Sequence, residues 1–364
     1  MADCWIEYEL TNDQRRCFAL EQVEPGWEKI ELKPSQFDLY DTFAYLCGNT
    51  LRKIICVGEG LYAEQAYREE VSEDGKYLLP KTAKGKPVPL TAANALKRTP
   101  VGMALVYSNR CVSVCNCDTQ RDYYRSSYCG LTLSSFSDFE HFVSDWCRET
   151  TPENQADLDA FALLPRVHQK YREGDFFRFR INRTLFGYGR ILLDYSAMRK
   201  QNIPFWEIFM GKPICACVYR IATDRKDCTP AELTALSALP STMVMDNIFY
   251  YGECEIIGNL PLQPEEADYP IHYGQSISMG DTALNYQCGK TFLTLPGETE
   301  LVSGFRNGAI GWQLNVSLPV LLDCIRENSN LPYWNQPNYQ VNQDLRNPKF
   351  RPLLEKVQDQ FHIR

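Results

Sequence analysis

The segment from Tyr171 to Tyr195, YREGDFFRFRINRTLFGYGRILLDY, decides how the C-terminal half of the chain folds. Its first part alternates aromatic or aliphatic side chains with arginines, and its second part, from Leu185 to Leu193, is almost entirely apolar. Alternation with a period of two is typical of a β-strand that buries one face. A short polar break, Asn182–Thr184, separates the two parts, so the segment predicts an antiparallel hairpin from Gly174 to Leu193.

Glycines mark the start of this hairpin and its second strand. Gly174 and Asp175 predict the turn that opens it, and Gly187 and Gly189 flank Tyr188 in its second strand. Paired glycines in a strand predict a bulge or the close approach of another backbone. A bulge would project the ring of Tyr188 toward a partner. The hairpin contains no nucleophile, metal cluster or phosphate loop, so the residues by themselves predict no reaction.

Short motifs continue downstream in a recognisable order. After Gly174–Phe177 and Phe186–Leu192 come five further motifs: Leu239–Ser241, Asp246–Ile248, Tyr250–Glu253 with Gly252, Ile256–Asn259 with Gly258, and Tyr269–Gly274. In this order they resemble the immunity protein 26 family of bacterial polymorphic toxin systems, over roughly residues 166–280. The resemblance implies a protein that neutralises a cognate toxin by binding it. It implies no catalytic residue and no cofactor.

Aromatic residues in the same region are the candidates for toxin binding. Tyrosine and tryptophan are enriched at interfaces because they bury a large area and keep one polar group. The predicted contact residues are Tyr188, Tyr250 and Tyr251, with Arg183 and Arg190 as bidentate partners for carboxylates. Further aromatic side chains, of which many are expected to pack inside the domain, are Trp206, Tyr269 and Tyr273.

Length and composition indicate a globular protein of two domains. The 364 residues are 44% hydrophobic and 23% charged, and domains average about 150 residues. The first residues lack the cationic and apolar pattern of a signal peptide, and no apolar stretch is long enough to span a bilayer. We therefore expect a cytoplasmic protein that does not enter a membrane. An odd number of cysteines, fifteen, fits reduced thiols.

The two halves of the chain differ in charge. Residues 1–165 carry 17 Lys or Arg against 25 Asp or Glu, whereas residues 166–364 carry 21 of each. The formal net charge of −8 therefore lies in the N-terminal half, and an acidic chain argues against a nucleic-acid partner. Thr150–Gln155 is the expected linker. We predict an α+β fold with an acidic α+β domain over residues 1–150, whose role is unassigned, and a β-rich, immunity-like domain over residues 160–364.

Local signals place several helices. Serine or threonine followed three residues later by an acidic residue or glutamine forms a capping box, which starts a helix. Such patterns occur at Thr11–Gln14, Ser137–Glu140 and Thr229–Glu232. In the second domain we expect antiparallel strands with flanking helices, a late helix at Leu318–Glu327, and a surface tail from Leu331 to Pro348.

Two alternatives to toxin binding come from the residues. Glu253 and Glu255 are two apart in an expected strand from Phe249 to Ile257, which puts their carboxylates about 7 Å apart on one face. Such a pair suits acid–base hydrolysis, although alternating glutamates on a strand are by default the mark of a solvent face. The other alternative is an intracellular adaptor. A metal site is not predicted, because the spacing of Cys111, Cys115, Cys117 and Cys129 departs from the zinc pattern.

Overall fold

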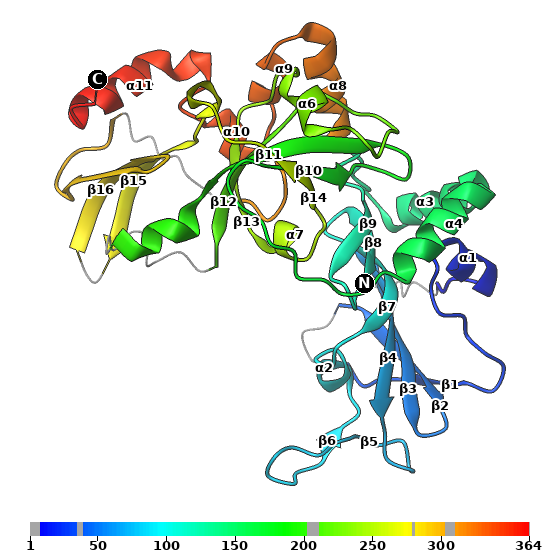
Figure 1. Cartoon of the computed structure of the whole chain (residues 1–364). Coiled ribbons are helices and arrows are strands. Elements are labelled where there is room, and N and C mark those ends of the chain that lie inside the picture. Colours follow the sequence, from blue (N-terminus) through cyan, green and yellow to red (C-terminus); the bar gives the residue numbers. More distant parts are fainter. Residues whose placement is uncertain (1–7, 35–38, 202–210, 279–280, 303–309, 364) are drawn as a thin grey trace. The chain divides into compact units, whose positions relative to one another are not determined.

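A computed structural model of the chain describes residues 8–34, 39–201, 211–278, 281–302 and 310–363. The chain forms two compact units: Met1–Val167 with Asn182–Thr184, and His168–Ile181 with Leu185–Arg364. Each unit contains helices and antiparallel sheets, so the predicted α+β class is confirmed (Figure 1). Trp206 of the expected aromatic set lies outside the described residues.

The N-terminal unit is built on a seven-stranded antiparallel sheet with the order β1-β2-β3-β4-β7-β8-β9. Each strand pairs with the next one along the sheet, mostly through tight hairpins, which accounts for the simple order. The strands are β1 (Glu28–Glu31), β2 (Asp41–Cys47), β3 (Thr50–Gly58), β4 (Leu61–Glu70), β7 (Val101–Ser108), β8 (Cys111–Asn116) and β9 (Arg121–Arg125).

Both faces of this sheet are covered. In β3, Ile55 and Val57 point into one core, and Ile54 and Cys56 point into the other, because successive side chains alternate across a strand. The first core is closed by α1 (Asn12–Cys17), α3 (Phe136–Glu149) and α4 (Pro152–Ala162). The second core is closed by α2 (Ala92–Ala95) and the small hairpin of β5 (Tyr77–Leu78) and β6 (Val88–Pro89).

The capping signals locate the helices of this unit to within a few residues. The box at Thr11 is confirmed at the start of α1. The box predicted at Ser137 is wrong by two residues, since Ser135 caps α3 and accepts a hydrogen bond from the backbone N–H of Asp138 at 3.2 Å. Starting at Phe136 places that ring in the core. The expected linker at Thr150–Gln155 is also wrong, because Thr151 caps α4 and starts a helix there.

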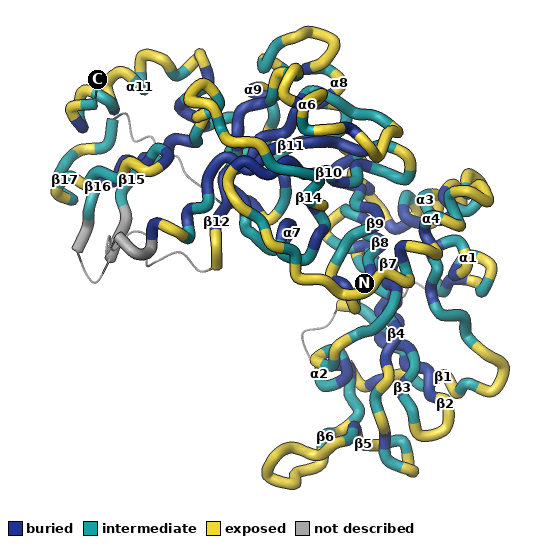
Figure 2. Tube along the Cα trace, in the orientation of Figure 1, coloured by how far each residue is buried: buried dark blue, intermediate teal, exposed yellow. Residues whose placement is uncertain are grey.

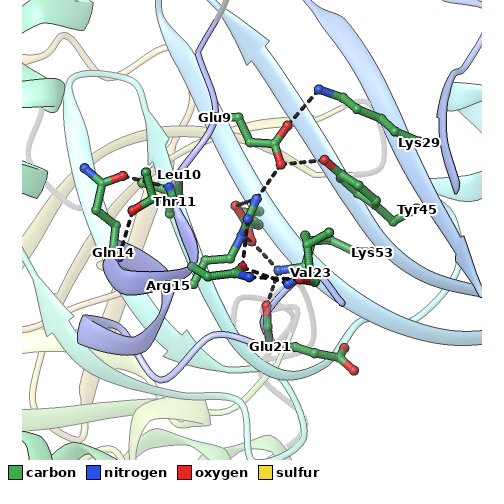
Figure 3. A network of polar contacts seen from close by, with 12 residues as sticks. Glu9, Leu10, Thr11, Gln14, Arg15, Glu21, Val23, Lys29, Tyr45 and Lys53 are labelled. Atoms are coloured by element: carbon green, nitrogen blue, oxygen red, sulfur yellow. Dashed lines mark hydrogen bonds and ion pairs between the residues drawn. The ribbon is translucent and has the colours of Figure 1, made fainter. Parts of the chain in front are cut away.

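A buried ionic network fastens α1 to the sheet (Figure 3). Arg15 donates from Nε to Glu64 Oε1 at 2.7 Å and from Nη2 to Glu9 Oε1 at 2.6 Å. Glu64 also accepts from the ammonium of Lys53 and, at 2.7 Å, from the hydroxyl of Tyr62. Because Arg15, Lys53 and Glu64 are all buried, their charges compensate one another in the core rather than in solvent.

The ionisation of this network follows from burial and its ion pairs. Burial raises the pKa of Glu9, but hydrogen bonds from Lys29, Tyr45 and Arg15 lower it more, so the net shift is downward. For Lys53, burial lowers the pKa, and Glu64 restores only part of the loss. Arg15 and Lys53 therefore share Glu64 as their buried ion-pair partner.

The C-terminal unit contains a five-stranded antiparallel sheet with the order β13-β12-β11-β10-β14. The predicted hairpin is confirmed: β10 (Asp175–Arg180) pairs with β11 (Phe186–Asp194), and Phe177 lies opposite Gly189. β11 and β12 are buried along almost their whole length (Figure 2). The other strands of this sheet are β12 (Pro213–Val218), β13 (Thr242–Met245) and β14 (Glu255–Asn259).

Helices and a second sheet surround this centre. The three-stranded sheet of β15 (Ile271–Ser278), β16 (Asp281–Cys288) and β17 (Thr291–Pro296) packs against α11 (Arg351–Gln360) through Val357 and Phe361. The helix predicted at Leu318–Glu327 is confirmed as α8. The remaining short helices are η1 (Tyr195–Gln201), α6 (Pro230–Thr234), α7 (Asn247–Tyr250), η2 (Pro264–Glu266), α9 (Leu331–Trp334), α10 (Tyr339–Asn342) and η4 (Pro348–Phe350).

Two expectations for this unit are wrong. The strand expected from Phe249 to Ile257 is instead the end of α7, a turn and then β14, and Gly252 adopts a φ of +75° in the turn. The segment from Leu331 to Pro348 does not simply cover the surface. It forms short helices that bury Tyr333, Trp334 and Leu345.

Candidate functional site

Tyr188 lies in the core rather than on the surface. Its side chain is 0% exposed, and its hydroxyl donates to the carbonyl oxygen of Arg225 at 2.6 Å. The ring belongs to a cluster with Phe176, Phe186 and Tyr219. The structure therefore differs from the expectation that Tyr188 projects toward a partner, because the face of β11 that carries it is covered by the segment after β12.

The glycines beside Tyr188 create room instead of a bulge. The β10–β11 register runs without a shift through Gly187 and Gly189. A Cβ atom at Gly187 would lie 2.3 Å from Cζ of Phe179, and one at Gly189 would lie 2.3 Å from Cζ of Phe177. The two phenylalanine rings lie over the two glycines, on the opposite face from Tyr188. The second expectation, a close backbone, holds at Gly189, where the carbonyl oxygen of Cys217 would be 2.3 Å from the added Cβ.

Both predicted arginines are engaged within the chain. Arg190 is 1% exposed, pairs with Glu266 and donates to the carbonyl oxygen of Leu260 at 2.7 Å. The guanidinium of Arg183 lies 3.4 Å from the ring centroid of Trp146 and donates to that residue's carbonyl oxygen at 2.8 Å. Burial lowers the pKa of Arg183. These contacts fix both guanidinium groups against other parts of the chain.

Tyr250 and Tyr251 lie partly exposed and form a small aromatic surface with His168. The imidazole of His168 stacks on Tyr250 with ring centroids 4.5 Å apart, and the two tyrosine rings meet edge to face at 5.1 Å. The segment that carries the two tyrosines is fixed by Gln169. The side-chain amide nitrogen of Gln169 donates to the carbonyl oxygens of Phe249 and Cys254, both at 2.9 Å. We call His168, Tyr250 and Tyr251 the aromatic surface.

The predicted turns close around the start of the hairpin. Gly174 has a φ of +85°, and a Cβ there would lie 2.3 Å from the carbonyl oxygen of Leu260. Asp175 is buried and accepts hydrogen bonds at 2.7 Å from the backbone of Arg172 and from the side chain of Asn259. At Gly258 an added Cβ would meet Pro230 at 2.6 Å, so this glycine allows α6 to pack on β14.

Glu253 and Glu255 do not form a pair on one strand. Glu253 precedes β14, and Glu255 is its first residue. Glu255 is 48% exposed and accepts a hydrogen bond from Arg178 at 2.6 Å. The arrangement that would suit acid–base hydrolysis, two carboxylates on one face of a strand, is therefore absent at this position.

A cavity of about 520 Å³ lies between the five-stranded sheet and the helices that follow residue 328. Its apolar wall includes Leu192, Cys217 and Tyr219, and its polar rim includes Glu265 and Asp268. Trp334 and Arg346 close the side formed by the C-terminal segment. The sequence reasoning did not identify this cavity.

Arg346 is the centre of the polar groups at this cavity. It pairs with Asp268 at 2.8 Å and Asp344 at 2.7 Å, and it donates to the carbonyl oxygen of Ser241 at 2.6 Å. Burial lowers the pKa of Arg346, the two carboxylates raise it more, and the net shift is upward. The guanidinium therefore stays charged and joins the C-terminal segment to the loop before β13.

His272, on β15, is a neutral group in this region. Burial lowers the pKa of its imidazole to about 4, partly opposed by Asp344 and assisted by Arg346. Its Nε2 is buried without a hydrogen-bond partner in the described part of the chain. At neutral pH the imidazole therefore carries no charge.

The hairpin and the motifs that follow it lie in a segment that matches a known protein family. Residues 172–282 match the model of the family Immunity protein 26. No curated protein and no solved structure matches the chain. The immunity protein 26 segment thus starts at the turn before β10 and ends at the beginning of β16.

The immunity protein 26 segment supplies the aromatic pair Tyr250 and Tyr251 and the sheet wall of the cavity, whereas Trp334 and Arg346 lie beyond it. The only sequence signal for Arg346 was its position beside Asp344 in a segment rich in asparagine and proline. In the described parts of the chain, no helix has the length and apolar content for a bilayer crossing. No three His, Cys, Asp or Glu side chains of the described residues gather to hold a metal ion.

Proposed function

We propose that this chain is a cytoplasmic immunity protein that neutralises a cognate polymorphic toxin by stoichiometric binding, without catalysing a reaction. The observation that carries the proposal is the match of residues 172–282 to the Immunity protein 26 family. The partner is a protein; neither nucleic acid nor a membrane is part of the proposal.

The aromatic surface is the part of the immunity protein 26 segment that we assign to toxin contact. Of the five residues predicted from the sequence, Tyr188 and Arg190 are buried and Arg183 contacts Trp146, while Tyr250 and Tyr251 are partly exposed. Partly exposed tyrosines on a rigid support are typical of interface hot spots, because they bury apolar area at a small entropic cost. Gln169 provides that support.

The test uses the cognate toxin domain, sought first among the products of the neighbouring genes. The double variant Tyr250→Ala/Tyr251→Ala should weaken binding by about 2 kcal/mol or more, as central interface aromatics do. Its melting temperature should change little, since both rings are partly exposed. Isothermal titration and thermal melts on the same sample separate the two effects. Unchanged affinity would remove the aromatic surface from the interface.

A second double variant tests the proposal that the chain does not act as an enzyme. Glu253→Gln/Glu255→Gln should protect cells against the toxin as the unaltered chain does, within about a few-fold, since exposed ion pairs such as Arg178–Glu255 contribute little. A protein that binds the toxin normally but loses protection by orders of magnitude would support the hydrolase alternative instead.

A further inference from the structure

A second cavity, of about 670 Å³, lies along α3 in the N-terminal unit. Its floor is aromatic and consists of Tyr124, Phe142 and Trp146. The ring centroid of Trp146 lies 5.1 Å from that of Tyr124 and 5.6 Å from that of Phe142. The three rings therefore form one continuous apolar surface. Trp146 is held in place because its Nε1 donates to the carbonyl oxygen of Cys17 at 2.8 Å. We call this cavity the α3 groove.

The rim of the α3 groove is acidic. Asp138, Asp145 and Glu149 line it, and Arg148 lies beside the last two. Asp145 and Glu149 are 52% and 67% exposed, and they share the single guanidinium of Arg148 at 2.6 and 3.5 Å. Arg183 also lines the groove and interacts with Glu149. Three carboxylates therefore face two guanidiniums, and the groove keeps a formal charge of −1.

The same imbalance extends over both helices of this region. Residues 136–162, which form α3 and α4, contain seven Asp or Glu and one Arg. Their net charge of −6 is most of the −8 of the whole chain. A local field of this strength attracts cationic surfaces and accelerates their association, and it repels nucleic acid and other polyanions.

Part of the floor is occupied by a guanidinium of the chain itself, because Arg183 lies over the ring of Trp146, 3.4 Å from its centroid. This contact shows that the floor can hold an arginine side chain, and Tyr124 and Phe142 line the rest of it. Arginine and lysine place their aliphatic stems on apolar surface and their charged ends near carboxylates, and a cation over an aromatic ring gains further energy. Aromatic floor and acidic rim together therefore suit the side chains of a basic polypeptide.

We infer that the α3 groove is a second docking surface, which binds a segment of the toxin that is rich in lysine and arginine. This inference rests on the proposed function and gives the N-terminal unit a role in it. The aromatic surface would contribute short-range contact, and the α3 groove would contribute steering and selectivity for a basic partner.

The experiment measures association and dissociation rates of the full chain with the toxin domain used in the binding test above, at several salt concentrations. Asp145→Asn/Glu149→Gln removes two charges from the rim. The matched control, Glu153→Gln/Asp159→Asn, removes two charges from α4 at residues that do not line the groove. We expect the rim variant to associate about tenfold more slowly at low salt, with a weaker salt dependence, because charges at an interface act mainly on the association rate.

A second comparison uses substitutions that place a longer side chain in the groove. Thr132, an exposed lining residue, is replaced by Lys, which adds a cation, or by Gln, which adds similar length without charge. Thr132→Lys should slow association clearly more than Thr132→Gln. Thermal melts of all four variants confirm that they remain folded.

The outcomes are distinct. Equal slowing by the rim variant and its α4 control would show only a general effect of net charge and would overturn the assignment of the groove. Unchanged rates in the rim variant and in Thr132→Lys would overturn it as well. If Tyr250→Ala/Tyr251→Ala loses binding while the groove variants do not, the proposed function stands and this inference fails. If the unaltered chain does not bind the toxin, the proposed function fails, and this inference fails with it.

Discussion

Phe177 and Phe179 occupy the space that side chains at positions 189 and 187 would otherwise fill. Each ring lies over a glycine of the neighbouring strand, and an added Cβ would be 2.3 Å from the ring in both cases. Cβ atoms do not approach other heavy atoms so closely, so the backbone or the ring would have to move. The glycines of β11 are therefore required by packing, at a site where the register is regular.

Gly189→Ala should destabilise the C-terminal unit by about 1–3 kcal/mol, the usual cost of overpacking a close-packed interior. The reason is the double approach to the ring of Phe177 and the carbonyl oxygen of Cys217, of which the carbonyl cannot rotate away. Gly60→Ala is the control, because no heavy atom lies within 4 Å of a Cβ there. Denaturant unfolding of both variants measures the difference, and equal stabilities would contradict the packing argument.

The sequence predicts the strands of the hairpin but not which of its side chains are buried. Alternation of apolar and cationic residues is a local pattern, so β10 and β11 follow from the printed sequence. Whether Tyr188 is buried depends on Tyr219 and Arg225, which cover it from later in the chain. A local pattern carries no information about such contacts, and the expected surface tyrosine is a core residue for this reason.

Elements whose signals are local were predicted best. The capping boxes at Thr11 and Thr229 involve a side chain and a backbone group three residues apart, and both start helices. The C-terminal segment could not be predicted in this way, because the partners of Arg346 include Ser241 and Asp268, far away in the sequence. Its asparagines and prolines indicated a loop, whereas the long-range ion pairs make it one wall of a cavity.

Glu64→Gln should destabilise the N-terminal unit by about 3–5 kcal/mol, because it removes the shared partner of two buried cations. Arg15 would keep only its ion pair with Glu9, Lys53 would lose the ion pair with Glu64 in the core, and the ion pair that joins α1 to β4 would be lost. Lys53 already has a lowered pKa through burial, so its deprotonation would relieve part of the cost. Denaturant unfolding at pH 7 measures the effect.

The matched control for this prediction is Glu21→Gln. Glu21 pairs with Arg52 and Arg68, of which Arg68 is half exposed, so water can solvate the cations that the variant leaves. The expected loss is below about 1 kcal/mol, as for other exposed pairs. Losses of similar size in the two variants would show that burial does not decide the strength of the network.

At the scale of the whole molecule, charge and family match divide the chain in the same place. The acidic excess lies in residues 1–165, and the match to Immunity protein 26 lies in residues 172–282. The compact units separate after Val167, apart from Asn182–Thr184. Chain length predicts two domains, and the difference in charge between the halves supports this prediction. The expected linker lies too early, since Thr151 and Pro152 start a helix whose Leu158 and Phe161 enter the first core.

We predict that residues 163–364 fold without the rest of the chain. The fragment begins after α4 and keeps the buried clusters of the five-stranded sheet and the cluster that the second sheet shares with α11. It loses the contacts of Arg183 with Trp146 and Thr150. Arg183 lies in the loop of the hairpin, so the pairing of β10 with β11 does not depend on these contacts. The purified fragment should melt cooperatively, and Gly189→Ala should lower its melting temperature as it does in the full chain. A fragment that aggregates, and recovers only when residues 1–162 are supplied, would show that the C-terminal unit depends on the N-terminal one for its fold.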